Sequence, residues 1–121
     1  MNKCKMTMIA VITLFGCLFH SDRDVYGVEV ATIAEGLNVP CGVTIQPETG
    51  HVFVADSGAG RVIRIVDGKI EAVITGFPID KYGKGPIYPI GPLGLAFIDR
   101  DVLAVGGGGF PDAKDLLRIY N

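Results

Sequence analysis

Residues 40–75 read PCGVTIQPETGHVFVADSGAGRVIRIVDGKIEAVIT. Short runs rich in Val and Ile alternate in this stretch with turn-forming residues, and Asp67-Gly68 is a dipeptide favoured in tight two-residue hairpins. The pattern predicts β-strands over residues 42–46, 51–56, 61–66 and 69–75. Strands that follow one another through short turns form an antiparallel meander, so an all-β fold is expected.

The second half of the chain repeats this pattern at a spacing of about 50 residues. The matching segments are 40–45 with 92–97, 52–55 with 102–105, and 62–65 with 116–119. A repeat of this length built of four strands is typical of a β-propeller blade. The sequence therefore predicts one complete blade followed by three strands of a second.

One further strand is expected before the first blade, because residues 30–37 line up with residues 70–77. The predicted fold is a partial β-propeller: about two four-stranded antiparallel blades plus one stray N-terminal strand, preceded by a signal-peptide helix. About two blades cannot close a ring. The sequence therefore predicts either a truncated propeller or self-association of several copies.

The first 27 residues have the pattern of a secretory signal peptide. Lys3 and Lys5 precede a mostly apolar run over residues 6–19, and the small or modest residues 25–27 form a cleavage site. The run is shorter than the roughly 20 residues that cross a bilayer, so a membrane anchor is the less favoured alternative, as is a lipoprotein signal ending at Cys17. The predicted division is a signal peptide over 1–27 and a propeller segment over 28–121, exported to the periplasm, the cell envelope or the medium, with no stable membrane span after cleavage.

Composition narrows the class of partner. A net charge of -2 at pH 7 lacks the basic footprint of a nucleic-acid-binding protein, so no nucleic acid is expected as a partner. A hydrophobic content of 49% excludes an intrinsically disordered chain. Signal cleavage would leave Cys41 as the only cysteine and therefore no intrachain disulfide. The expected partner is a protein or small-molecule ligand whose identity the composition does not reveal.

Three short motifs in the first repeat carry a family resemblance. Pro40-x-Gly42-Val43, the run GHVFVADSG over residues 50–58, and Arg61-Val62 together resemble the NHL repeat of six-bladed β-propellers. The second repeat is weaker, since Gly106-Gly107-Gly108 stands where the first has Asp56-Ser57-Gly58. Relatives of this superfamily include gluconolactonase-like and strictosidine-synthase-like propellers and many binding modules. The resemblance implies a binding or interaction scaffold.

The alternative that the resemblance leaves open is a remnant or subunit of a gluconolactonase-like, metal-dependent hydrolase. That family has a metal-binding Glu where this chain has Asn38, and the chain contains no Trp. Asn38 could offer one oxygen to Ca²⁺, but the other expected ligands would come from later blades. The sequence therefore leans against an enzyme, assigns no catalytic residue, metal site or cofactor, and reserves Ca²⁺ for this alternative.

The segment over residues 77–91 is the longest stretch expected to contain no strand. Lys81, Tyr82, Lys84 and Tyr88 in this segment could grip an anionic or sugar-like ligand, and a rigid spacer that covers a blade edge is the alternative.

Four other positions are interpreted as structural or exposed. Asp56 is a weaker binding candidate, because an Asp at the end of a strand more often accepts backbone hydrogen bonds. His51 is expected to be solvated, and Arg64 and Arg118 are expected to be equivalent, each in an ion pair or on an exposed strand face.

Export can be tested directly. If residues 1–27 are a signal peptide, mass spectrometry of the mature protein from the cell envelope or medium should find a start near Val28, and deletion of residues 1–27 should retain the chain inside the cell. A mature product that still carries Lys3 and Lys5 would contradict the prediction.

Overall fold

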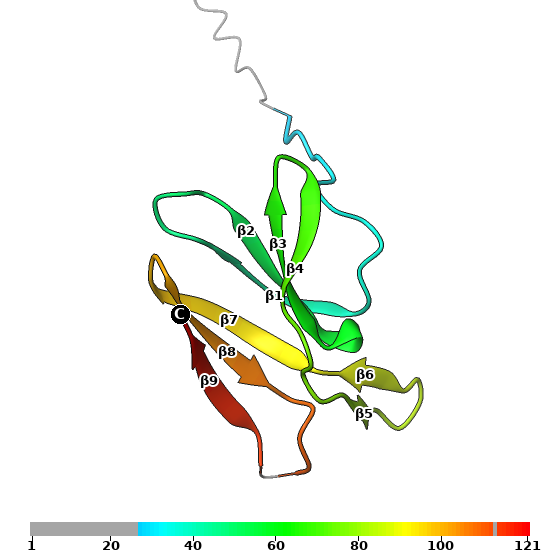
Figure 1. Cartoon of the computed structure of the whole chain (residues 1–121). Coiled ribbons are helices and arrows are strands. Elements are labelled where there is room, and N and C mark those ends of the chain that lie inside the picture. Colours follow the sequence, from blue (N-terminus) through cyan, green and yellow to red (C-terminus); the bar gives the residue numbers. More distant parts are fainter. Residues whose placement is uncertain (1–26, 113) are drawn as a thin grey trace, which may run out of the picture. The chain divides into compact units, whose positions relative to one another are not determined.

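The computed structural model describes residues 27–112 and 114–121. The predicted signal-peptide helix lies outside these residues. The described residues from 31 onward form one compact unit that contains nine β-strands and one short turn of 3-10 helix, η1 (Ser57–Ala59) (Figure 1). The expected all-β class, with antiparallel sheets, is confirmed.

The first sheet contains four strands in the order β1-β2-β3-β4. They are β1 (Pro40–Ile45), β2 (Val52–Asp56), β3 (Arg61–Val66) and β4 (Lys69–Ile74). Each strand pairs antiparallel with the next, as a meander requires. The four strands predicted from residues 40–75 are therefore confirmed, with boundaries that differ by no more than two residues.

The second sheet contains three strands in the order β7-β8-β9. They are β7 (Pro92–Asp99), β8 (Val102–Gly107) and β9 (Leu116–Tyr120), and all pairings are antiparallel. The sheet thus has the three strands that the repeat predicted.

The connection between the two sheets differs from its prediction. Residues 77–91 were expected to form no strand, but β5 (Asp80–Tyr82) and β6 (Tyr88–Ile90) pair as a small antiparallel hairpin that projects from the larger sheets (Figure 1). Gly83 lies in its turn at φ 123, and a Cβ there would lie 2.3 Å from the Pro86 carbonyl oxygen. A tight turn that only glycine can make therefore brings the two short strands together.

The predicted stray N-terminal strand is wrong. Residues 27–37 contain no strand, and none of the three sheets in the described part of the chain includes them. A β-strand persists only where a neighbour accepts its backbone hydrogen bonds, so apolar alternation in the sequence is not sufficient. β4 consequently forms one outer edge of the first sheet, and β9 forms one of the second.

The core lies between one face of the first sheet and one face of the second. Its buried residues are Phe53, Val62, Phe77, Leu103 and Val105, with Ile74, Leu95, Phe97 and Tyr120 packed against them. Phe53 of β2 meets Phe97 of β7 edge to face, with ring centroids 5.0 Å apart. None of the sheets in the described chain closes on itself.

The backbone pairing moves the alignment of the two repeats by one residue along β8. Pro40 pairs with Asp56, whereas Pro92 pairs with Gly107. Gly107, and not Gly106, is therefore the counterpart of Asp56. Gly106 and Gly107 both belong to β8 and pair with β9.

The shift also changes which residue of the first repeat corresponds to Arg118. From β1 through β3, the aligned residues Val43, Val54 and Ile63 correspond to Leu95, Val105 and Arg118 of the second sheet. The predicted equivalence of Arg64 and Arg118 is therefore wrong, and Arg118 is the counterpart of Ile63. A slip of one residue matters because it moves a side chain to the opposite face of the sheet.

Truncating the aromatic contact between the sheets tests the core. Phe53→Ala should lower the free energy of unfolding by about 3–5 kcal/mol, because it leaves a cavity where Phe53 meets Phe97. Urea denaturation followed by circular dichroism measures this change. Ile87→Ala, at an exposed position of the hairpin turn, should change it by less than about 0.5 kcal/mol. Equal effects of the two substitutions would contradict this location of the core.

Candidate functional site

Asp56 links the segment that precedes β1 to the end of β2 and the start of β3. Its side chain is fully buried at the end of β2. Oδ1 accepts a hydrogen bond from the backbone N–H of Asn38 at 2.6 Å, and Oδ2 accepts one from Nε of Arg61 at 2.7 Å. Both carboxylate oxygens are therefore engaged by groups of the chain itself, as a buried carboxylate requires.

Ser57 extends this contact to the start of the second sheet. Its buried hydroxyl oxygen accepts a hydrogen bond from the backbone N–H of Gly91 at 2.8 Å. A Cβ at Gly91 would lie 2.5 Å from the Ser57 carbonyl oxygen, so the close approach requires glycine. Asp56 and Ser57 thus tie together three segments that are distant in sequence.

Asn38 lies beside Asp56 and Ser57, which together we call the buried anchor. Its backbone oxygen accepts a hydrogen bond from the N–H of Gly58 at 2.8 Å. A Cβ on Gly58 would lie 2.8 Å from the Asn38 side-chain oxygen Oδ1, so the amide lies over the η1 turn. The structure therefore brings two sequence candidates, Asn38 and Asp56, together through a backbone contact.

The other four candidates lie on the β5–β6 hairpin, and all are exposed. Tyr82 pairs directly with Tyr88, so both side chains lie on one face of the hairpin, 72% and 49% exposed. Lys81 pairs with Pro89 and belongs to the opposite face, because successive strand residues alternate. Lys84 lies in the turn between Gly83 and Gly85. The hairpin thus presents two adjacent tyrosines with an ammonium group at its tip.

The base of the hairpin is fixed to the buried anchor. At one end the N–H of Phe77 donates to the Gly60 carbonyl oxygen at 3.1 Å, and at the other Gly91 donates to Ser57. Phe77 itself is buried in the core. The backbone that carries the two tyrosines is therefore held at both ends of the hairpin.

A second polar site, not among the sequence candidates, lies at the turn between β3 and β4. A cavity of about 530 Å³ is lined there by His51, Arg64, Val66, Asp67, Lys69, Ile70 and Glu71. Arg64 Nη2 donates to Glu71 Oε2 at 2.6 Å, which confirms the expected ion pair. The Asp67-Gly68 turn could have revealed this cluster, because a two-residue hairpin turn makes Arg64 and Glu71 direct partners on β3 and β4.

Two further single-residue expectations have different outcomes. His51 was expected to be solvated, but its Nδ1 atom is buried and has no hydrogen-bond partner among the described residues. Arg118 was expected in an ion pair or on an exposed strand face, and it is exposed on β9, where it lies over the ring of Phe110, 5.2 Å from its centroid, in a cation–π contact.

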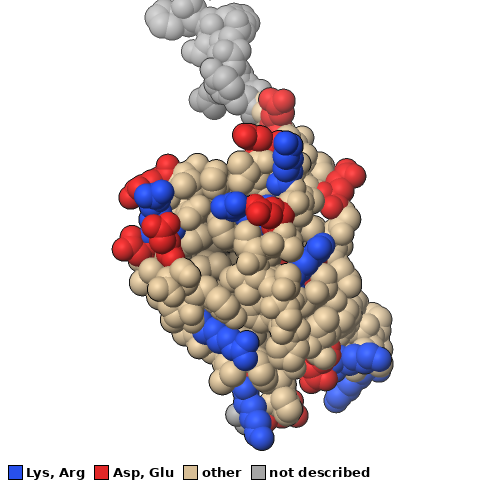
Figure 2. Space-filling view, viewed as in Figure 1, with Lys and Arg blue, Asp and Glu red and all other residues tan. Residues whose placement is uncertain are grey.

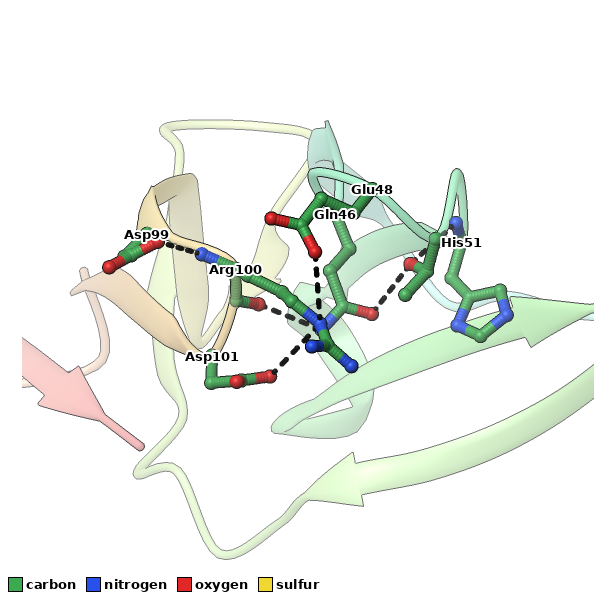
Figure 3. Close-up of polar contacts among 7 residues, drawn as sticks. Gln46, Glu48, His51, Asp99, Arg100 and Asp101 are labelled. Atoms are coloured by element: carbon green, nitrogen blue, oxygen red, sulfur yellow. Dashed lines mark hydrogen bonds and ion pairs between the residues drawn. The ribbon is translucent and has the colours of Figure 1, made fainter.

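Polar contacts join the β1–β2 and β7–β8 turns. Gln46 Nε2 donates to the Arg100 carbonyl oxygen at 2.8 Å, and Arg100 Nε lies 3.7 Å from Glu48 Oε2 (Figure 3). The charged groups are exposed, so their ion pair contributes little to stability. These contacts join the two turns, and neither turn includes a residue of the β5–β6 hairpin.

Charge on the surface is mixed. Figure 2 shows acidic and basic side chains interspersed on the visible face, without a large area of one sign.

Among the residues that the structure describes, no three His, Cys, Asp or Glu side chains gather into a group that could hold a metal ion. Within the same part of the chain, no helix has the length and apolar character to cross a membrane. No family model matches the chain, and no curated protein matches it.

Replacing the buried carboxylate tests the anchor. Asp56→Asn keeps one oxygen acceptor but removes the charged partner of Arg61, so the free energy of unfolding should fall by about 1–3 kcal/mol. The same substitution at exposed Asp112 should change it by less than about 0.5 kcal/mol. Urea denaturation measures both variants. Unchanged stability in Asp56→Asn would show that these hydrogen bonds do not hold the fold.

Proposed function

We propose that this chain is an exported, NHL-like β-propeller segment that acts as a binding scaffold. The observation that carries the proposal is the pair of adjacent exposed tyrosines, Tyr82 and Tyr88, on a hairpin anchored at both ends. Signal-peptide export places this surface outside the cytoplasm. Its partners in the proposal are a protein or small molecule at the hairpin and a second copy of the chain at its open sheet faces.

The arrangement of the sheets supports the propeller part of the proposal. Two antiparallel meanders follow one another along the chain and pack face to face through Phe53 and Phe97. Their first strands, β1 and β7, lie against each other. Radial repetition of such sheets around their first strands is how a propeller is built.

The chemistry of the hairpin indicates the class of ligand. Tyrosine rings offer an apolar face together with a hydroxyl group, which suits the mixed apolar and polar surface of a sugar. Lys84 at the hairpin tip adds an ammonium group, which attracts carboxylates. An acidic sugar polymer combines both features, so it is the ligand class that fits the hairpin best.

Hydrolysis is the weaker candidate, because no contact among the described residues favours it. Both oxygens of Asp56 are used inside the fold, and the Asn38 amide lies over the η1 turn. General acid–base chemistry needs a titratable group within reach of a bound substrate, and these two residues do not supply one.

Binding by the hairpin is tested with two polymers, polygalacturonate as the acidic probe and dextran as the neutral one. Tyr82→Ala combined with Tyr88→Ala should weaken polygalacturonate binding of the mature protein at least about fivefold, because each aromatic contact contributes about 0.5–1.5 kcal/mol. Titration calorimetry measures binding, and the melting temperature should stay within about 2 °C of the unmodified protein because both side chains are exposed.

Ile87→Ala in the same turn is the matched control and should leave binding unchanged. Equal binding by the double variant and the unmodified protein, or no binding of either polymer by the unmodified protein, would contradict this ligand class.

A further inference from the structure

The two sheets each have an outward face that is apolar and partly open. On the first sheet, strand alternation places Val43 and Ile45 opposite the core-facing side, and they are 67% and 62% exposed. On the second sheet, Leu117 and Ile119 lie on the outward face and are 72% and 52% exposed. Large apolar side chains gathered on a sheet face in this way mark an interaction surface.

The repeat determines how these faces are related. The outward residues of the first sheet, Val43, Ile45, Val52 and Val54, are the counterparts of Leu95, Phe97, Leu103 and Val105, which face the core in the second. Conversely, Thr44 and Phe53 on the inner side of the first sheet correspond to outward Ala96 and Ala104. Each open face is therefore the counterpart of a face that is already packed within the chain.

A pair of glycines provides a separate observation. A Cβ on Gly42 of β1 would lie 2.3 Å from the Leu93 carbonyl oxygen, so β7 can approach β1 only because residue 42 is glycine. Its counterpart in the second repeat is Gly94, at the same place in β7. A Cβ on Gly94 would meet nothing within 4 Å. The described part of the chain therefore gives no packing reason for glycine at residue 94.

We propose that the outward face of the second sheet docks onto the outward face of the first sheet of a second copy. In this arrangement the backbone around Cys41, the counterpart of Leu93, approaches Gly94 of the neighbouring copy as Leu93 approaches Gly42 within the chain. β7 of one copy then lies beside β1 of the next. The inference rests on the tandem-sheet part of the proposed function and not on ligand binding by the hairpin.

The chemistry of the faces favours a second copy over an unrelated protein. On the outward side of the second sheet Gly94, Ala96, Ala104, Gly106, Leu117 and Ile119 are uncharged, and the one charged residue of this ladder, Asp99 opposite Val102, lies at its end. That of the first sheet includes Val43, Ile45, Val52, Val54, Ile70 and Ala72, also uncharged, whereas Ile63 and Ile65 on the same side are already buried within the chain. The two faces differ from each other, so the contact is head to tail and leaves one face of each kind for a further copy.

Gly94→Val is the most direct test. The valine side chain would occupy the space that the neighbouring copy fills in this proposal, and its Cβ would not contact the described part of its own chain. We expect the unmodified mature protein to have a molar mass at least twice that of the monomer in light scattering at about 100 µM, and Gly94→Val to be monomeric with an unchanged or higher melting temperature. Ile45→Asp on the opposite face should also be monomeric, whereas Ile87→Asp in the hairpin turn should associate like the unmodified protein.

Mixing the two monomeric variants distinguishes this geometry from other contacts. Gly94→Val retains an intact first-sheet face and Ile45→Asp an intact second-sheet face, so an equimolar mixture should form a one-to-one dimer. A monomeric unmodified protein, association of Gly94→Val, or no dimer in the mixture would each overturn the proposal. Polygalacturonate binding is measured on the same variants, and its loss or retention tests the hairpin separately from the association.

Discussion

The buried carboxylate of Asp56 and the neighbouring hydroxyl of Ser57 bring both sheets to a common starting point. Asp56 fixes the backbone of Asn38 just before β1, and Ser57 fixes that of Gly91 just before β7. A carboxylate without access to water must be compensated, which Arg61 and Asn38 do. Since β1 and β7 begin at points held by adjacent residues, their faces are presented to each other, and the Phe53–Phe97 contact follows.

The second repeat lacks this anchor. The counterpart of Asp56 is Gly107, which continues β8 and pairs with both neighbouring strands. Without a carboxylate, the end of the second sheet is held by backbone hydrogen bonds, including one from Gly108 N–H to the Gly91 carbonyl oxygen at 2.8 Å. The two sheets thus share a strand pattern but differ in the groups that hold their ends.

The proposed binding surface and the core lie in different parts of the molecule. The hairpin with Tyr82 and Tyr88 extends from the anchor and contributes no residue to the main core. The apolar faces proposed for association lie on the two larger sheets. Substitutions on the hairpin and on the sheet faces should therefore act independently, because residues without shared partners have nearly additive effects.

The sequence by itself determined which residues form the seven strands of the two larger sheets, because alternation, β-branched residues and turn dipeptides are properties of neighbours along the chain. It also singled out Asp56 as a structural carboxylate and the tyrosines near residue 85 as a pair worth testing. It could not determine pairing across space. Residues 30–37 have the composition of a strand but no partner, and β5–β6 is a hairpin because Gly83 permits a tight turn. The faces of Arg64 and Arg118 depended on register, where a slip of one residue reverses the direction of a side chain, and register is set only when the sheets form.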